Sequence, residues 1–312
     1  MPDNSGDNGL EKTVQIKRPS TVFEQMRLTL PSKAYMVIIG GMDMGCVIPL
    51  DQPRITLGRA PECTIVLQDE SVSRVHAEVV QRETEGVLIR DLGSTNGTFL
   101  GGKRITESVL RKGDKVLLGR QTILKYEIYD QLDAVYQKKI YESSTRDGLT
   151  GVYNRRYFNQ RIVPELSFTR RHSIWLTLLI FDLDNFKKIN DVYGHQNGDQ
   201  VLVSVTGAVS SILRTEDLFA RYGGEEFTII APGTNYEGGL ALGQRVRQRV
   251  ESEAIIPEES SGKVIKTTVS VGVTAVAPGF AGEPAAVIAA ADGNLYEAKH
   301  GGRNKVVCSL LR

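Results

Sequence analysis

Cysteine is scarce in this chain. Its 312 residues include only Cys46, Cys63 and Cys308, which are widely separated. Such spacing fits neither a disulfide framework nor a set of metal ligands. It suits a reducing compartment, and we therefore expect the protein in the cytoplasm.

Long apolar runs and a strong net charge are absent as well. The longest apolar run, residues 174–181, is far too short to span a bilayer, and no apolar segment follows a basic start as in a signal peptide. The formal net charge of +1 gives no reason to expect general affinity for nucleic acid. We therefore expect neither a membrane nor nucleic acid among the partners. The length and the 41% of hydrophobic residues are enough for about two folded domains.

The first 32 residues differ from the rest. They are polar and charged, contain Pro2, Pro19 and Pro31, and show no sustained apolar period. We interpret residues 1–32 as a mobile N-terminal tail. Two interpretations of it stay open, an inert extension and a segment with a regulatory role.

Residues 33–129 have the pattern of an all-β domain. Short β-type runs are separated by Gly, Pro, Asp and Asn, which favours a β-sandwich. In such a sandwich the loops at one end can converge into a binding site. The expected strands are residues 35–39, 46–50, 54–57, 64–67, 76–81, 87–91, 115–118 and 122–129.

Three loops of this domain carry a specific set of residues. They are Gly58-Arg59, Ser73-Arg74-Val75-His76 and the stretch Asp-Leu-Gly-Ser-Thr-Asn-Gly-Thr-Phe at residues 91–99. With these motifs in this order, residues 35–129 resemble the forkhead-associated (FHA) domain, a phosphothreonine reader. The resemblance implies an all-β FHA sandwich that binds a phosphopeptide.

The same resemblance implies roles for single residues. Arg59, Ser73 and Arg74 would hold the phosphate, and Asn96 would bond the peptide backbone. A dianionic phosphate favours guanidinium and hydroxyl donors, and an amide side chain can both donate and accept, so these residue types suit the roles. Gly58 and His76 have the character of architectural residues. The alternative is a sandwich that has kept its shape and lost its ligand.

The phosphothreonine ligand is either a partner protein or the tail of this chain after the action of a Ser/Thr kinase. FHA domains often select the residue three positions after the phosphothreonine. Thr13 has the apolar Ile16 there and is our first candidate phosphorylation site. Thr21, with Glu24 at that position, is the second.

Residues 130–146 are predicted to form a connecting helix. Leu132, Val135, Tyr136 and Ile140 fall on one helical stripe. The helix either packs on its own domain or serves as a dimer or relay helix, and both interpretations stay open.

Residues 147–312 mix helices with strands. A hairpin within the sheet and helices flanking it indicate an α/β (α+β) fold. The expected strands are residues 174–183, 266–277 and 305–308. One expected helix runs to about residue 171, and the others span residues 185–193, 198–213, 236–252 and 284–300.

The hairpin is the most informative stretch of this domain. Apolar segments, residues 217–220 and 228–231, flank Arg-Tyr-Gly-Gly-Glu-Glu-Phe, and the Gly223-Gly224 pair favours a tight turn. Alone, Glu225 and Glu226 beside such a turn usually mean a solvated loop. A second acidic strand end, Asp182-Leu183-Asp184, follows a buried apolar run. We expect these two aspartates to point to opposite faces, so that one joins the hairpin acids while Asp184 caps the next helix.

With the loop Asp147-Gly-Leu-Thr-Gly, the signature Gly223–Phe227 and the closing stretch 294–304, residues 145–310 resemble the GGDEF domain of diguanylate cyclases. Glu225 replaces the name-giving Asp, a variant common in active members. The resemblance implies a nucleotidyltransferase that makes the bacterial second messenger cyclic di-GMP. Two GTP molecules condense when each 3′-hydroxyl attacks the α-phosphate of the other, and two pyrophosphates leave.

The resemblance also implies the site. Asp182, Glu225 and the Leu183 carbonyl would bind Mg²⁺, with Mn²⁺ as an alternative, and Glu226 would either assist at the 3′-hydroxyl or complete the metal site. Asn190 and Asp199 would read guanine. The remaining expected contacts to the nucleotide are Phe186, Lys187, Gly223, Gly224, Lys299 and Arg303. The plainer interpretation of Lys299 and Arg303, four residues apart, is one solvated helix face.

Arg214 and Asp217 match the Arg-x-x-Asp product-inhibition motif of the family at the expected separation from Gly223. Alternatively they are a helix-end arginine and a loop aspartate. Because the reaction is symmetric in two GTP, we expect a homodimer for catalysis. The rival function is a catalytically silent GTP or cyclic di-GMP receptor that acts as a phosphoprotein-binding scaffold.

Overall fold

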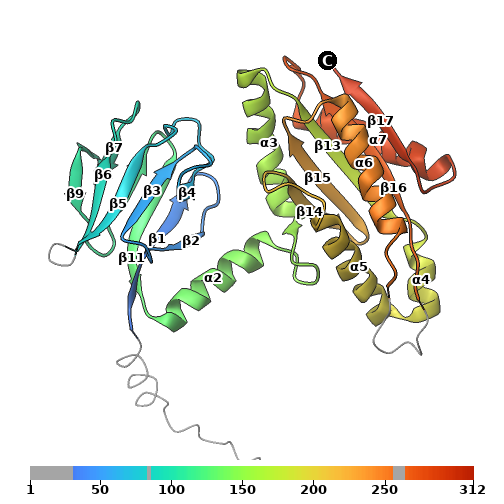
Figure 1. Ribbon diagram of the computed structural model, residues 1–312, viewed down its shortest axis with the longest axis horizontal. Coiled ribbons are helices and arrows are strands. Elements are labelled where there is room, and N and C mark those ends of the chain that lie inside the picture. Colours follow the sequence, from blue (N-terminus) through green and yellow to red (C-terminus); the bar gives the residue numbers. More distant parts are fainter. Residues whose placement is uncertain (1–30, 83–85, 256–263) are drawn as a thin grey trace, which may run out of the picture. The chain divides into compact units, whose positions relative to one another are not determined.

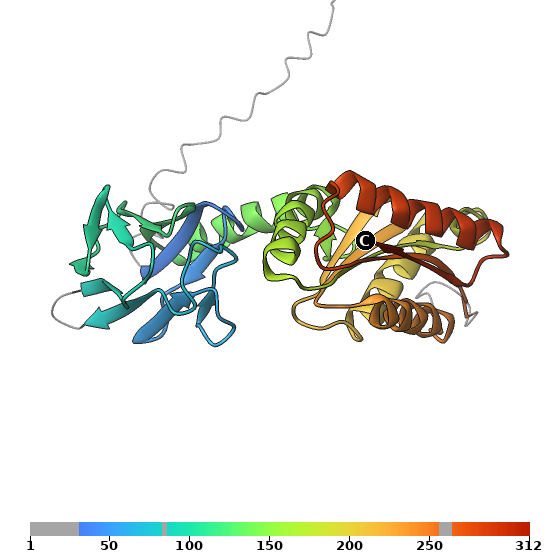
Figure 2. The ribbon, with the colours of Figure 1, turned by 90° about the horizontal axis from the view of Figure 1, so that it is seen from above.

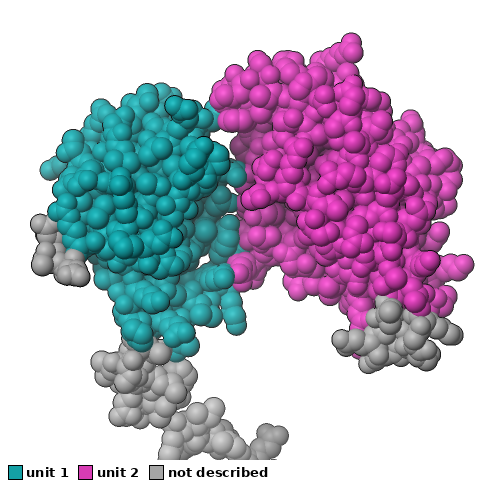
Figure 3. Space-filling view, viewed as in Figure 1, with its two compact units in different colours: residues 1–141 teal, residues 142–312 magenta. Residues whose placement is uncertain are grey.

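The structure, a computed structural model, describes residues 31–82, 86–255 and 264–312. The chain divides into two compact units, Met1–Tyr141 (unit 1) and Glu142–Arg312 (unit 2) (Figure 3). The two candidate phosphorylation sites, Thr13 and Thr21, and nearly all of the expected tail lie outside the described residues.

Unit 1 is built from two β-sheets (Figure 1). One has the order β2-β1-β11-β10-β7-β8 and the other β4-β3-β5-β6-β9. Side chains from both, such as Met36, Leu124, Ile55 and Ile89, form one buried core between them. The predicted all-β sandwich is therefore confirmed. Its strands are β1 (Lys33–Gly40), β2 (Val47–Pro49), β3 (Arg54–Gly58), β4 (Ile65–Val66), β5 (Ala77–Arg82), β6 (Gly86–Asp91), β7 (Thr98–Leu100), β8 (Lys103–Ile105), β9 (Glu107–Val109), β10 (Lys115–Leu118) and β11 (Thr122–Tyr129).

Three strands of unit 1 were not predicted. These are β7, β8 and β9, each three residues long. β8 and β9 lie at the edges of their sheets, where only one neighbour pairs with them and the side chains stay largely exposed. Such short edge strands need no alternating apolar pattern, so the sequence carries little signal for them.

Unit 2 is one sheet of the order β12-β14-β15-β13-β16-β17 with helices on both faces. Helices α5 and α6 pack on one face and α3 and α7 on the other (Figure 2). The α/β fold is confirmed. The elements are β12 (Tyr153–Asn154), α3 (Arg155–His172), β13 (Leu176–Leu183), α4 (Phe186–Tyr193), α5 (His195–Ser210), β14 (Leu218–Gly223), β15 (Glu226–Pro232), α6 (Tyr236–Glu251), β16 (Val269–Val276), α7 (Pro284–His300) and β17 (Val306–Leu311).

The central strand β13 positions the acidic end that the sequence singled out. All eight of its residues are buried. Leu179 and Phe181 join the core under α5 and α6, whereas Leu178 and Ile180 join the core under α3 and α7. A strand covered on both faces needs a continuous apolar run rather than an alternating one. The strand thereby delivers Asp182 at a fixed place in the sheet.

Helix α2 (Gln131–Thr145) follows β11. Its apolar stripe is exposed: Leu132 by 53%, Val135 by 47%, Tyr136 by 63% and Ile140 by 45%. This exposure argues against a helix that buries the stripe on its own domain. No helix in the described ranges is long and apolar enough to cross a membrane.

The contact between α7 and β16 gives a stability prediction. A methyl group on Gly272 would lie 2.2 Å from the Ala291 carbonyl oxygen and 2.3 Å from the Leu295 nitrogen, both in the helix backbone. We therefore expect Gly272→Ala to push α7 from the sheet and to lower the free energy of unfolding by about 2–3 kcal/mol. The single tryptophan, Trp175, lies in unit 2, so its fluorescence during urea unfolding reports this change.

Gly293→Ala is the matched control. It lies in the same helix, and nothing stands within 4 Å of the added methyl group. Because alanine is the better helix former, this variant should gain up to about 1 kcal/mol. Equal stability of the two variants would contradict the close packing.

Candidate active site and phosphopeptide site

The predicted hairpin is present. Strands β14 and β15 pair antiparallel, with Gly223 opposite Glu226 and a register shift after Arg221. Gly224 has a φ of +44°, a left-handed conformation that strongly favours glycine. Glu225 and Glu226 are partly buried at this turn. The turn therefore holds both acids at the edge of the folded core.

Arg221 fixes the turn to the beginning of unit 2. Its Nε donates to the Gly224 carbonyl at 2.9 Å, and its Nη1 donates to Asp147 Oδ1 at 3.0 Å. Asp147 also accepts from the Thr150 backbone N–H and hydroxyl. Burial alone would raise the pKa of Asp147, but the bonds from Thr150 and Arg221 outweigh it and lower the pKa. The sequence showed both ends of this link, but no local pattern predicted their contact.

Asp182 faces the hairpin acids. It is opposite Glu226 in the pairing of β13 with β15, and the next residue, Leu183, donates its N–H to the Glu225 carbonyl at 3.4 Å. Burial, together with the charges of Glu225 and Glu226, raises the pKa of Asp182 to about 6, although Lys299 acts in the opposite direction. The structure thus brings together Asp182, Leu183 and both glutamates.

Lys299 is the cation of this cluster. Its Nζ, from the last turn of α7, lies 2.9 Å from Asp182 Oδ2. The interpretation that Lys299 and Arg303 share a helix face is wrong. Helix α7 ends at His300, and Arg303 has a φ of +62° with its N–H donated to the Ala298 carbonyl. Arg303 is instead exposed on the loop after the helix.

Asp184 has a separate, structural role. Its carboxylate accepts hydrogen bonds from the Thr268 and Ser270 hydroxyls and from the Asn304 N–H. It does not cap α4, whose N-cap is Asn185. The expectation of opposite faces was wrongly argued, because residues two apart on a strand share a face. What separates Asp184 from Asp182 is the end of β13 at Leu183 and these three donors.

The two expected guanine readers lie on neighbouring helices, Asn190 on α4 and Asp199 on α5. Helix α5 begins at His195 rather than at the predicted Gly198. A methyl group on Gly198 would lie 1.8 Å from Asn190 Oδ1, so glycine permits the close approach of the two helices. Asp199 and Lys187 are exposed, whereas Phe186 is 7% exposed and belongs to the core.

In unit 1 the predicted phosphate loops also meet. Ser73 Oγ accepts from the Thr95 N–H at 3.0 Å and lies 3.4 Å from the Thr95 hydroxyl. Asn96 donates its side-chain amide to the Ser71 carbonyl at 2.7 Å. Thr95, which none of the sequence motifs singled out as a ligand, adds a hydroxyl donor next to Ser73. Arg59 and Arg74 stand on the loops before and after β4.

His76 and Gly58 hold these loops together. His76 is fully buried, accepts from the Ser73 N–H at its Nδ1 (3.0 Å) and contacts the Gly97 carbonyl through Nε2 (3.2 Å). Burial lowers the pKa of His76, which favours the neutral ring that these bonds require. A methyl group on Gly58 would lie 2.1 Å from the Arg74 carbonyl oxygen. Both residues therefore shape the site without facing a ligand.

Comparison with known families agrees with both units. The family described as "Diguanylate cyclase, GGDEF domain" matches residues 144–305, which is just over half of the chain. The chain belongs to this GGDEF family. The FHA domain matches residues 55–119, within unit 1.

Individual relatives of this GGDEF protein are known. "Probable diguanylate cyclase DgcC" of Escherichia coli K12 is 36% identical over 172 residues, which is 55% of this chain and 45% of the relative. "Diguanylate cyclase A" of Treponema denticola is 36% identical over 235 residues, 71% of this chain and 62% of the relative. The crystal structure of the coiled coil and GGDEF domain of DgcB from Caulobacter crescentus in complex with c-di-GMP is 28% identical, covers 57% of this chain and 93% of that one, and has a TM-score of 0.54. The chain spans less than two thirds of both curated relatives.

The Arg-x-x-Asp motif of the GGDEF domain forms a tight turn. Asp217 Oδ2 accepts from the Arg214 backbone N–H at 2.9 Å, while Asp217 Oδ1 is buried without a hydrogen-bond partner among the described residues. Burial raises the pKa of Asp217. The Arg214 side chain is 64% exposed and lies 4.0 Å from Glu216. The exposed guanidinium and the turn carboxylate are thus neighbours without a direct ion pair between them.

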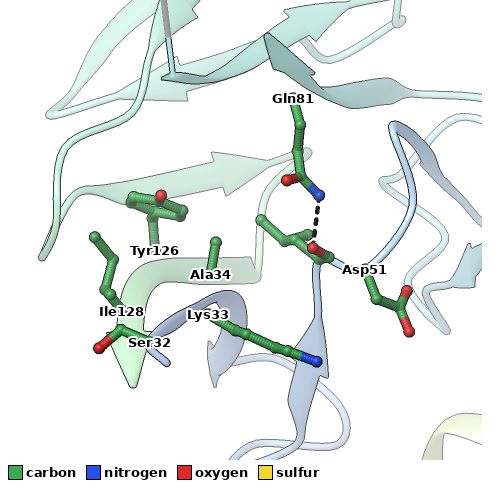
Figure 4. Close-up of a pocket in the computed structure, with 8 residues that line it drawn as sticks. Ser32, Lys33, Ala34, Asp51, Gln81, Tyr126 and Ile128 are labelled. Atoms are coloured by element: carbon green, nitrogen blue, oxygen red, sulfur yellow. Dashed lines mark hydrogen bonds between the residues drawn. The ribbon is translucent and has the colours of Figure 1, made fainter. Parts of the chain in front are cut away.

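A cavity of about 470 Å³ lies elsewhere, in the FHA unit (Figure 4). Its lining includes Lys33, Leu50, Gln81 and Tyr126, and Gln81 donates to the Leu50 carbonyl across it. It contains none of the predicted site residues. Nor do the described His, Cys, Asp and Glu side chains form a ready-made metal centre of three or more.

The buried charge of Asp182 predicts a pH-dependent stability. Folding raises the pKa of its carboxyl group from 3.8 to about 6. The protonated carboxyl group therefore contributes stability below pH 4, and this contribution is lost as the pH rises through 6. Above pH 6 the charge costs up to about 3 kcal/mol. The melting temperature of the wild type should therefore fall between pH 4 and pH 7 relative to that of Asp182→Asn. Thermal unfolding in EDTA at a series of pH values measures this. If the melting temperature of the wild type instead rises relative to that of the variant as the pH increases, the ion pair with Lys299 outweighs the effect of burial.

Proposed function

We propose that this chain condenses two GTP molecules into cyclic di-GMP with release of two pyrophosphates. The observation that carries the proposal is the cluster at the hairpin turn, where Asp182 stands opposite Glu226 and Leu183 bonds to Glu225. An oxygen-rich, partly buried cluster on rigid strands suits phosphoryl chemistry, in which charge develops on phosphoryl oxygens. The relatives named as diguanylate cyclases support it.

The residues present fit a magnesium ion. Asp182 and Glu225 offer carboxylates, and the Leu183 carbonyl offers a third oxygen; Mg²⁺ is commonly bound by one or two carboxylates together with substrate phosphates. Burial and the neighbouring glutamates raise the pKa of Asp182 despite Lys299, so an additional cation would stabilise the charged form of this carboxylate. When bound, Mg²⁺ or Mn²⁺ would stabilise charge on the phosphoryl oxygens.

The surrounding side chains have distinct tasks in this reaction. Glu226 accepts the proton of the attacking 3′-hydroxyl. Lys299 Nζ is held 2.9 Å from Asp182 Oδ2, and its charge would stabilise the phosphates of a nucleotide bound beside these acids. Arg303 and Lys187, both exposed, neutralise phosphate from either side.

Guanine selection rests on Asn190 and Asp199. A carboxylate accepts from the ring N–H and the exocyclic amine of guanine, a pattern that adenine lacks. The close approach of Asn190 to Gly198, the residue before Asp199, supports the assignment of both side chains to one base. GTP is therefore preferred over ATP.

Each chain presents one GTP, so two GGDEF domains must meet face to face. The exposed apolar stripe of α2 supports its interpretation as a dimer or relay helix. The FHA unit would control this meeting by binding a phosphothreonine segment, from a partner or from the tail after action by a kinase. Cyclic di-GMP at Arg214 and Asp217 would restrain it. The cytoplasm, with its GTP, is the expected location.

Glu226→Gln tests the proposal. The variant keeps the shape of the side chain but cannot take up the proton, so turnover should fall at least about 100-fold while the melting temperature stays near that of the wild type. Cyclic di-GMP and pyrophosphate formed from GTP and Mg²⁺ are quantified by chromatography. Glu237→Gln, an exposed acid on α6, is the control and should keep full activity. A wild type that binds GTP but forms no product would instead support a receptor.

A further inference from the structure

The end of unit 1 that carries the phosphate loops has two arginines besides the two that are predicted to hold the phosphate. Arg59 and Arg74 are the predicted phosphate ligands. Arg104 and Arg120 lie on the same loop system, since the Arg120 N–H donates to Ser71 Oγ and Asn96 donates to the Ser71 carbonyl. Within the part of the chain that the structure describes, none of the four guanidinium groups has a hydrogen bond or an ion pair. Arg104 and Arg120 therefore have no structural explanation.

Arg104 is placed most specifically. It stands on β8 opposite Phe99, and its side chain folds over Gly97. A methyl group on Gly97 would lie 2.7 Å from Arg104 Nε and 3.1 Å from Cζ. Gly97 also has a φ of +84°. The absence of a side chain at Gly97 thus makes room for a guanidinium immediately beside Asn96.

These contacts order the site along one loop. Thr95 bonds to Ser73 on the phosphate side, Asn96 follows, and Gly97 contacts Arg104 on the far side. Thr95 and Gly97 are at most about 7 Å apart, and an extended peptide advances about 3.3 Å per residue. A peptide whose phosphothreonine lies at Ser73 and whose backbone crosses Asn96 therefore brings a side chain two or three residues away to Arg104.

We propose that Arg104 is a specificity-determining residue that binds a carboxylate two or three residues after the phosphothreonine. The inference rests on the proposed phosphopeptide function of unit 1. A guanidinium free of intramolecular partners forms a charge-assisted, bidentate bond with a carboxylate. This inference reverses the ranking of the two tail sites. Glu24 lies three residues after Thr21, whereas the residues two and three positions after Thr13 are the uncharged Gln15 and Ile16.

A double-mutant cycle tests the pair. The unphosphorylated full-length chain is titrated with a labelled peptide of residues 18–27 phosphorylated at Thr21, and binding is followed by fluorescence anisotropy. Glu24→Gln in the peptide and Arg104→Gln in the protein should each weaken binding about five- to tenfold. In the Arg104→Gln protein the Glu24→Gln change should have no further effect, because the two residues act as one pair.

Lys103→Gln is the matched control, since it removes the same charge from the neighbouring position of β8. A loss equal to that of Arg104→Gln would show general attraction and would overturn the inference. The inference would also be overturned if Glu24→Gln weakened binding as much in the Arg104→Gln protein as in the wild type. Coupling of Arg104 to Glu11 in a phosphorylated Thr13 peptide would overturn it as well, because it would place the acid before the phosphothreonine.

The failure of the underlying function gives a different result. If the phosphorylated Thr21 peptide binds no tighter than the unphosphorylated one, and Arg59→Gln changes nothing, unit 1 is no phosphopeptide reader and both proposals fall. Phosphate-dependent binding without coupling between Glu24 and Arg104 refutes only the inference about specificity.

Discussion

The cyclase domain depends on holding mutually repelling acids together. Asp182 and Glu226 are opposite each other on the paired strands β13 and β15, and Glu225 lies on the turn directly before β15, so the three acids cannot separate. The raised pKa of Asp182 reflects the cost of this arrangement, and Lys299 offsets only part of it. The acids stay in place because β13 is buried on both faces and because Arg221 ties the turn to Asp147. We interpret this local destabilisation as a consequence of the proposed task of the site, which is to bind a cation together with one charged nucleotide.

The Arg221 contact also links the acidic turn to the beginning of unit 2. Asp147 lies directly after α2, the helix that leads from unit 1 into unit 2. A change in the direction of this helix would act first on Asp147 and through Arg221 on the turn that carries the acids. The bond therefore offers a short physical connection between whatever orients the helix and the geometry of the acidic turn.

Much of this site could be predicted from local patterns. The Gly-Gly turn, the apolar run before Asp182 and the three FHA loops each have a signal within about ten residues. The parts that were missed depend on contacts between distant residues. Arg221 reaches Asp147 across 74 positions, and Asp184 reaches Asn304 across 120. Arg303 cannot share a helix face with Lys299 because α7 stops at His300, which is where the predicted helix 284–300 already ended.

We propose that one chain of this protein contains half of a catalytic centre, which is completed only when two chains meet. The most direct measurement is the initial rate of cyclic di-GMP formation per chain over a dilution series, with the oligomeric state followed by sedimentation under the same conditions. The rate per chain should fall toward zero as the protein dissociates into monomers. A rate per chain that stays constant through the monomeric range would contradict the claim.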